Sequence, residues 1–223
     1  MDKLVLLKIG GSFFKKDSSS CLNKLAEVIS AAEEYKFVIV CGGGGAADLV
    51  RDFDSRHNLN NKTAHFAAIT AMEMNSYLFA DFFNNYSFFS TEFDLKNSIN
   101  IFLPLNYYKK FNPLPQSWQV TSDSIALELA IRINAEKLIL IKQRNYTAET
   151  LDFKINKKSF IEIKAEKINE NGLVDSHFPL LFNNHKINSD IFELEAVIIN
   201  GNSPRKLSAY LRGEAASITK IKK

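Results

Sequence analysis

The stretch Leu4-Val-Leu-Leu-Lys-Ile-Gly-Gly-Ser12 decides how this chain of 223 residues is interpreted. Its apolar run, Leu4–Leu7, suits a strand that is buried on both faces, as the strands of a parallel sheet are. The two glycines allow a tight turn whose backbone N–H groups can point at an anion, with Lys8 at the edge of that turn. The stretch therefore predicts a phosphate site, although a plain strand-to-turn junction with a solvated lysine has the same pattern.

Length and composition narrow the classes of protein to which the chain can belong. With 223 residues it can bury a substantial core, and one domain of two lobes is expected. A net charge of +3 is too mild for a nucleic-acid partner, which needs a concentrated basic face. No apolar run reaches the roughly 20 residues of a membrane span, so we expect no membrane partner. No secretory signal is recognisable at the start of the sequence.

The two cysteines, Cys21 and Cys41, lack the spacing of a metal site. Free thiols are typical of proteins in a reducing compartment, so we expect a cytoplasmic protein. The sequence predicts no dedicated metal ligand.

Strand signals and helix signals alternate along the chain, which predicts an α/β fold with a mainly parallel sheet. The expected strands after the opening one are 37–41, 99–103, 137–142, 195–199 and 216–221, the last at a sheet edge. The expected helices follow Ser18–Ser20, span 46–56 and 63–84, and begin at Ile125 and Pro204. Residues 143–190 are polar and weakly patterned, so short strands and loops are expected there.

The segment Lys109–Gln116 contains Pro113 and Pro115, so it is predicted to be a loop and the boundary between two lobes. The lobes are then residues 1–115 and residues 116–223 of a single domain.

Three glycine-rich or hydroxyl-rich junctions each follow a strand or begin a helix: Gly10-Gly-Ser12, Gly42–Gly45 and Thr121-Ser-Asp-Ser124. In an open α/β sheet such turns collect at the carboxyl ends of the strands, where ligands bind. A helix N-terminus adds free N–H groups and a favourable dipole, so each junction suits an anion. None is a P-loop or a Rossmann fingerprint, because the required Gly-Lys-Ser/Thr and G-x-G-x-x-G patterns are absent.

The three junctions, in this order and before a strand that starts at Lys137, resemble the amino acid kinase superfamily. Further stretches resemble one branch of it, the aminomethylfuranylmethyl phosphate kinases of methanofuran biosynthesis. These stretches are Ala64–Ile69, Ser117–Ser124, Val174–Pro179 and Asn200–Pro204. The resemblance spans nearly the whole chain and implies a three-layer α/β/α sandwich, ATP and Mg²⁺ as cofactors, and a small phosphate monoester as acceptor.

The resemblance also implies roles for residues. Lys8 would lie against the transferring phosphoryl group, and Asp123 would orient the lysines or assist Mg²⁺; an ordinary carboxylate at a helix N-terminus is the alternative for Asp123. The residues expected to bind the nucleotide are Gly10, Gly11, Ser12, Lys142, Asp175 and Phe178. The residues expected to bind the acceptor are Gly42, Gly43, Gly44, Arg51, His65, Thr121 and Ser122.

Several of these residues have structural alternatives. Lys142 and Arg51 are also consistent with solvated surface cations, and His65 with a packing or helix-terminal histidine. Trp118 could stack on a furan ring or belong to the core between the lobes. Asp175 and Phe178 could close part of the nucleotide site or form a structural turn.

The sequence departs from the superfamily at one place. Most members follow the strand at 137–142 with an aspartate-glycine turn that borders the nucleotide, whereas here no glycine occurs between Lys142 and Gly172. Three hypotheses therefore remain. They are a kinase for aminomethylfuranylmethyl phosphate, the same fold acting on isopentenyl phosphate, UMP or an amino-acid carboxylate, and a non-catalytic nucleotide- or anion-binding homologue. The apolar helix at 63–84 predicts a homo-oligomer.

Overall fold

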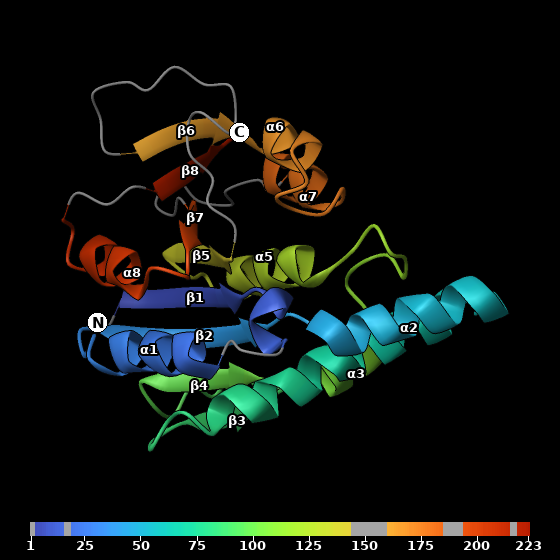
Figure 1. Cartoon of the computed structure of the whole chain (residues 1–223), viewed down its shortest axis with the longest axis horizontal. Coiled ribbons are helices and arrows are strands. Elements are labelled where there is room, and N and C mark those ends of the chain that lie inside the picture. Colours follow the sequence, from blue (N-terminus) through green and yellow to red (C-terminus); the bar gives the residue numbers. More distant parts are fainter. Residues whose placement is uncertain (1–2, 16–18, 144–159, 185–193, 215–217) are drawn as a thin grey trace.

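The computed structural model describes residues 3–15, 19–143, 160–184, 194–214 and 218–223. The strands within these residues are β1 (Lys3–Ile9), β2 (Tyr35–Cys41), β3 (Ser87–Phe89), β4 (Ile99–Phe102), β5 (Lys137–Lys142), β6 (Phe160–Lys164), β7 (Glu195–Asn200) and β8 (Ile218–Lys222). They form one sheet in the order β3-β4-β2-β1-β5-β7-β8-β6 (Figure 1). Neighbouring strands are parallel except β7 and β8, which are antiparallel.

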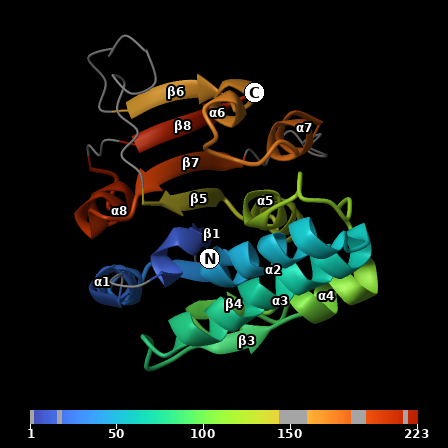
Figure 2. The same ribbon diagram turned by 45° about the vertical axis from the view of Figure 1, so that its right-hand side comes forward.

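Helices cover both faces of this sheet. Their bounds in the described part of the chain are η1 (Gly11–Phe14, a 3₁₀ turn), α1 (Ser19–Ser30), α2 (Gly44–His57), α3 (Asn61–Ala80), α4 (Pro104–Phe111), α5 (Ser122–Arg132), α6 (Ala165–Glu170), α7 (Phe178–Asn184) and α8 (Pro204–Leu211). Figure 2 shows α1 and α8 on one side of the sheet and α3, α4, α5 and α7 on the other. The predicted three-layer α/β/α sandwich is therefore confirmed.

The opening strand lies at the centre of the sheet, as its apolar run predicts. Val5, Leu7 and Ile9 face the core beneath α1 and α8, whereas Leu6 faces the core beneath α3 and α5. All four side chains are fully buried. Side chains alternate along a strand, so Lys8 points to the same face as Leu6 and lies on the α5 side of the sheet.

The parallel register brings the carboxyl ends of the central strands to one edge. Ile9 at the end of β1 pairs with Cys41 of β2 and with Ile141 of β5, and Ile141 pairs in turn with Ile199 of β7. The residues that follow these four positions therefore lie side by side, although they are far apart in the sequence.

The order of strands also separates the two parts of the chain that were expected to be lobes. Strands β1 to β4 occupy one half of the sheet and strands β5 to β8 the other, so the two halves meet where β1 pairs with β5 (Figure 1). No helix in the described residues has both the length and the apolar character that a membrane crossing demands.

The structure corrects several local predictions. Residues 109–111 are the last turn of α4 and not part of a loop, because Tyr107 and Tyr108 are buried and give this short helix an apolar face. Residues 165–170 and 178–184 are helices and not strands or loops. β8 is not an edge strand, since it lies between β7 and β6. The segment after Lys142, where the sequence lacks the family's aspartate-glycine turn, falls largely on residues 144–159, which lie outside the described residues.

Candidate active site

Two glycine turns meet at the carboxyl edge of the sheet. The first turn, residues 10–12, follows β1, and the second turn, residues 42–45, follows β2 and begins α2. A Cβ atom on Gly11 would lie 2.3 Å from Gly44 N, and one on Gly42 would lie 2.6 Å from Gly11 N. The turns therefore touch backbone to backbone, and only glycine permits that approach. Gly44 also has a φ of +55°, which favours glycine.

The N–H groups of these turns divide into two sets. Gly10 N–H donates to Ile141 O at 2.9 Å and Gly42 N–H donates to Ile9 O at 2.8 Å, so both extend the sheet. Among the described residues, no acceptor is paired with the N–H groups of Gly11, Gly43 or Gly44. The expectation that Gly10 and Gly42 donate to phosphates is thus wrong, because their hydrogens are already used. Gly11, Gly43 and Gly44 keep N–H groups that have no acceptor among the described residues.

A buried ion triad lies beside the glycine turns. Asp123, in the first turn of α5, accepts hydrogen bonds from Lys142 Nζ at 2.7 and 2.8 Å, and its Oδ1 lies 2.9 Å from Lys8 Nζ. Lys8 and Asp123 are 3% and 5% exposed, and the side chain of Lys142 is 15% exposed, so most of the triad is shielded from bulk water. Lys8 and Lys142 come from β1 and β5, which are adjacent strands, and Asp123 joins their ammonium groups.

Charge and burial act against each other in this triad. Burial alone would raise the pKa of Asp123, but the ammonium groups of Lys142 and Lys8 outweigh it and hold that pKa at about 2. Burial lowers the pKa of Lys142 to about 8, because the attraction of Asp123 offsets only part of the lost solvation. Near neutral pH the carboxylate is therefore ionised, and the site is rich in positive charge.

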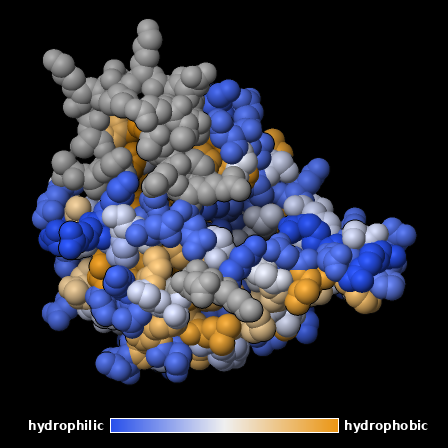
Figure 3. Space-filling view, in the orientation of Figure 1, coloured by the Kyte–Doolittle hydropathy of each residue, from blue (hydrophilic) through white to orange (hydrophobic). Residues whose placement is uncertain are grey.

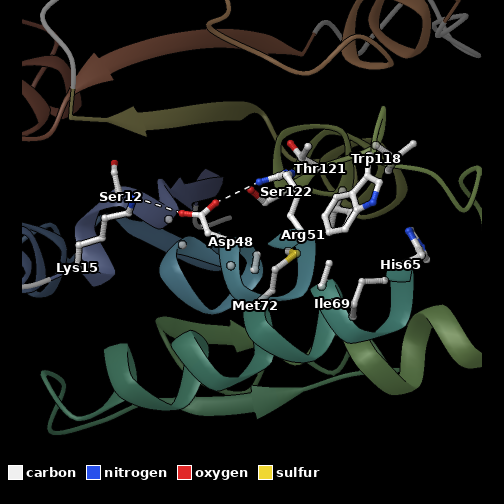
Figure 4. A pocket seen from close by; sticks show the side chains of 17 residues that line it. Ser12, Lys15, Asp48, Arg51, His65, Ile69, Met72, Trp118, Thr121 and Ser122 are labelled. Carbon is white, nitrogen blue, oxygen red and sulfur yellow. Dashed lines mark hydrogen bonds and ion pairs between the residues drawn. The ribbon is translucent and has the colours of Figure 1, made fainter. Parts of the chain in front are cut away.

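A pocket of about 300 Å³ opens next to the two turns, between α2, α3 and the start of α5 (Figure 4). Its inner end is formed by Gly11, Ser12, Gly43 and Gly44. Its walls include apolar and aromatic side chains, namely Ile69, Met72, Trp118, Val120 and Ile125. Such a pocket, with backbone donors at one end and apolar walls, suits a small molecule with an anionic end.

A linked set of side chains forms the outer wall of the pocket. The guanidinium of Arg51 lies 4.6 Å from the ring centroid of Trp118, and it also pairs with Asp48 at 3.1 Å. Trp118 Nε1 donates to Asp54 Oδ2 at 2.6 Å, and Lys15 Nζ lies 3.2 Å from Asp48. Figure 4 shows Arg51 and Trp118 side by side at the pocket. α2 and the segment before α5 are thereby held together.

His65 lies on the wall opposite the glycine turns. It is 5% exposed, and its Nε2 atom is buried without a hydrogen-bond partner in the described part of the chain. Its ring packs edge to face against Tyr108 at 5.9 Å, and burial lowers its pKa. His65 is thus a neutral side chain whose unused nitrogen would gain a hydrogen bond from a polar ligand.

The comparisons with known proteins agree with this geometry. A model of the amino acid kinase family matches residues 3–178, which include both glycine turns and all three members of the ion triad. This chain belongs to the amino acid kinase family. It is therefore a member of a family of phosphotransferases.

One relative within the amino acid kinase family matches almost end to end. It is the [5-(aminomethyl)furan-3-yl]methyl phosphate kinase of Methanocaldococcus jannaschii, which is 29% identical over 225 aligned positions. The alignment covers 97% of this chain and 96% of that protein.

Solved structures of UMP kinases share the fold. Those from Ureaplasma parvum and Archaeoglobus fulgidus superpose with TM-scores of 0.68 and 0.69, at 16% and 19% identity. The first match covers 100% of both chains, and the second covers 98% of this chain and 99% of the other. At such identities the likeness concerns the fold alone.

Most of the predicted acceptor residues of this kinase-family chain gather around the one pocket. Gly43, Gly44, Arg51, His65, Thr121 and Ser122 all line it, together with Gly11 and Ser12, which were expected to bind the nucleotide. Gly42 is not among the lining residues, because its N–H and C=O groups are turned toward β1 and α3.

Asp175 and Phe178 have structural roles here. The carboxylate of Asp175 accepts from both the N–H and the hydroxyl of Thr121, from both groups of Ser124, and from the N–H groups of His177 and Phe178. These six bonds fix the start of α5 and favour the structural turn over nucleotide contact. Phe178 is fully buried and stacks on Phe182 at 5.8 Å, so its side chain cannot reach a nucleotide and that prediction is wrong.

Sequence reasoning missed residues whose roles depend on distant partners. Asp48 and Asp54 pair with side chains of the pocket wall, and Asn75 donates to Gly42 O. The helical spacing that places Asp48 and Arg51 on one face of α2 was a usable signal. For Asn75 the signal was an amide in the part of α3 that is rich in apolar residues.

Proposed function

We propose that this protein transfers the γ-phosphoryl group of ATP to a small phosphate monoester, and that the acceptor is aminomethylfuranylmethyl phosphate in the biosynthesis of a methanofuran-type C1 carrier. The single observation that carries the proposal is the buried triad of Lys8, Asp123 and Lys142 beside two interlocked glycine turns. Two ammonium groups and several free N–H donors at the same edge of the sheet match the charge of two phosphate groups that meet end to end.

The reaction is a displacement at phosphorus. An oxygen of the acceptor phosphate forms a bond to the γ-phosphorus as the bond to the β,γ-bridging oxygen breaks, and the products are ADP and a diphosphate. Phosphoryl transfer mostly requires positioning and neutralisation of charge, with no covalent intermediate. Lys8 supplies positive charge to the transferring group, and Lys142 does so on the nucleotide side. The free N–H groups of Gly11, Gly43 and Gly44 bind phosphate oxygens.

Asp123 orients the two lysines in this proposal. Both of its oxygens are engaged by ammonium groups, which fits orientation better than direct ligation of a metal. In the described residues no three His, Cys, Asp or Glu side chains gather as a metal cluster. Mg²⁺ would accordingly be held through ATP phosphate oxygens, as is usual for this ion, and would neutralise part of their charge.

The choice of acceptor rests on the pocket and on the named relative. The apolar walls with Ile69, Met72 and Trp118 suit a small ring, and the glycine end suits its phosphate. His65 and Arg51 line the same pocket and would contact the acceptor. The relative from M. jannaschii is named for a phosphomonoester acceptor that carries a furan ring.

The test is an acceptor screen with the purified full chain. ATP and Mg²⁺ are incubated with aminomethylfuranylmethyl phosphate, isopentenyl phosphate, UMP, acetylglutamate or glutamate, and products are read by ³¹P NMR. We expect ADP and a new diphosphate doublet with the furan substrate. Asp123→Asn should lose this activity. Its matched control is Glu195→Gln, which should keep the activity, since Glu195 is also bound by two lysines but lies at the opposite, amino end of β7.

Other outcomes decide against the proposal. Transfer only to UMP or isopentenyl phosphate would keep the kinase chemistry and replace the acceptor. Transfer only to a carboxylate would overturn the phosphomonoester class. ATP binding without ADP release against any acceptor would favour a non-catalytic homologue.

We further propose that the protein is a homo-oligomer. The helix α3 packs one face on the sheet, but its opposite face leaves Met74, Tyr77 and Leu78 about half exposed. Figure 3 shows apolar surface in the part of the view where α3 crosses the molecule. A second copy would bury this surface. Mass photometry that finds only monomers at micromolar concentration would remove this proposal.

The lobes and the compartment complete the proposal. The half of the sheet built from residues 1–115 would hold the acceptor, and the half built from residues 116–223 would hold the nucleotide. Cys21 and Cys41 are free thiols, which supports a reducing, cytoplasmic compartment.

A further inference from the structure

A buried asparagine holds the second glycine turn from below. Asn75 lies near the middle of the long helix α3 and is 2% exposed. Its Nδ2 donates to the carbonyl oxygen of Gly42 at 2.6 Å. The neighbouring residues of α3 on this side are small, since Ala68 and Ala71 are the α3 groups that a Cβ on Gly43 would meet. The helix therefore presents its polar group where the turn passes closest.

An asparagine that only filled space in the core would lower the stability of the protein. An amide buried among apolar residues loses its hydration, and the loss is about 1–3 kcal/mol unless the amide is hydrogen-bonded. Asparagine is also a weak helix former, because its side chain competes with the backbone for hydrogen bonds. A Leu at this position would avoid both costs, but it would leave the carbonyl oxygen of Gly42 without its donor. What the asparagine adds is one directed donor toward the glycine turn.

The consequence for the turn follows from the planarity of the peptide group. Gly42 C=O and Gly43 N–H belong to one trans peptide, so they point in opposite directions. When Asn75 binds the carbonyl, the Gly43 N–H is turned to the side away from Asn75. The preceding peptide is fixed as well, because Gly42 N–H donates to Ile9 O in β1. The turn is thus held by β1 on one side and α3 on the other.

We propose that Asn75 is a positioning residue, which fixes the orientation of the Gly43 N–H so that it donates to a phosphate oxygen in the pocket. Gly43 lines that pocket, and its N–H has no acceptor among the described residues. Without the side chain, the flexible peptide between two glycines can rotate, and the donor loses its fixed direction. The inference rests on the proposed phosphate site and names what orients one of its donors.

The test observes the glycine amides directly. The chain has nine glycines, so a protein labelled with ¹⁵N-glycine gives a short, assignable ¹H–¹⁵N spectrum. Inorganic pyrophosphate is titrated into the wild type, into Asn75→Leu, and into Asn75→Ser as a smaller second variant in case the first does not fold. We expect a pyrophosphate-dependent shift of Gly43 in the wild type. In the Asn75 variants we expect a ten- to hundredfold weaker Kd and a reduced shift at Gly43.

The matched control is Ser76→Ala. Ser76 is the next residue of α3, is 1% exposed, and donates to Phe102 O at 3.0 Å. Its loss removes a comparable buried bond from helix to backbone, together with its contact with the Cys41 thiol at the end of β2, and it leaves the bond from Asn75 to Gly42 in place. We expect Ser76→Ala to lower thermal stability as the Asn75 variants do, and to keep the pyrophosphate Kd within threefold. In the acceptor assay, kcat/KM should fall ten- to hundredfold for the Asn75 variants alone.

Each result separates this inference from the proposed function. A wild type whose glycine amides do not respond to pyrophosphate would overturn the phosphate site itself. A response that is equally strong in the Asn75 variants would overturn the role of Asn75 and leave the site intact. An equal loss in Ser76→Ala would also overturn it, because the effect would then belong to the packing of α3 in general.

Discussion

Replacing Asp123 by Asn tests the buried triad most directly. The change keeps the shape of the side chain but removes the negative charge between Lys8 and Lys142, whose Nζ atoms lie 2.9 and 2.7 Å from Oδ1. Removing one partner of a buried ion pair destabilises a protein by about 3–5 kcal/mol, because the remaining charge has no counter-ion. The lowered pKa of Asp123 gives a figure of the same order. An Asp123 pKa of about 2 in place of 3.8 corresponds to about 2 kcal/mol at neutral pH.

The pKa values of the triad predict how the free energy of unfolding depends on pH. Asp123 has a lowered pKa, so its stabilisation is fully present above about pH 4 and is lost as the pH falls toward about 2. In Asp123→Asn the two lysines face each other without a counter-ion, which lowers the pKa of Lys142 further. The folded variant then binds fewer protons than the unfolded chain, so its free energy of unfolding rises with pH. The deficit of the variant should shrink between pH 7 and pH 9.

The assay is urea unfolding of both proteins at pH 7 and pH 9, with kcat measured on the same preparations. Glu195→Gln is the control, since Glu195 is bound by Lys137 and by Lys220 at 2.9 Å but its side chain is 30% exposed. We expect a deficit of about 3 kcal/mol for Asp123→Asn at pH 7 and about 1 kcal/mol for Glu195→Gln. Activity should be lost only in the first variant.

Two results would refute this account. A loss of less than about 1 kcal/mol in unfolding free energy at pH 7 would mean that water screens the charges of the triad, as it does in exposed ion pairs. A deficit that does not change with pH would mean that lysine desolvation is not its cause.

Three further predictions concern the walls of the site. Gly44→Ala should abolish pyrophosphate binding and lower the free energy of unfolding by more than about 2 kcal/mol, since its Cβ would lie 2.3 Å from Gly11 O at a positive φ. Gly45→Ala is the control and should be near neutral, because a Cβ there meets open space. Thermal melts measure the stability of both variants, and calorimetry measures their pyrophosphate binding. His65→Gln should remove a rise in acceptor KM that the wild type shows as the pH falls through the lowered pKa of His65, because burial favours the neutral ring and protonation adds an uncompensated charge. Asp175→Ala should lower Tm by breaking six hydrogen bonds, with the ATP KM of the folded enzyme changed less than threefold.

Local pattern was enough to predict the core strands and the positions of the glycine turns. β1, β2, β5 and β7 are short apolar runs bounded by glycine or polar residues, and such runs form buried strands almost regardless of their partners. The helices α4, α6 and α7 were missed for the opposite reason. They are six to eight residues long, too short for a clear period, and α4 and α7 depend on buried aromatic contacts with the rest of the fold.

The same division applies to the candidate site. Lys8 could be named from its place near the end of a strand, and Asp123 from the resemblance to the amino acid kinase superfamily. Their 2.9 Å contact could not be derived, because 115 positions of chain separate them and only the parallel register brings β1, β5 and α5 together. Asp175 shows the reverse error. A carboxylate near a proposed nucleotide site suggested a ligand contact, whereas its two oxygens accept hydrogen bonds from the start of α5 and from the N–H groups of His177 and Phe178.

The stretch from Leu4 to Ser12 by itself determined a central buried strand, a turn that needs glycine, and a lysine at the edge of that turn, where we propose the phosphate site. Its residues do so through local chemistry, namely burial of an apolar run and the freedom of glycine. The tertiary structure alone decided which N–H groups remain free, since Ile9, Ile141 and Asn75 occupy hydrogen-bonding groups that the sequence left open. Hydrogen bonds and ion pairs between distant segments form only after the chain has folded, so they cannot be read from local pattern.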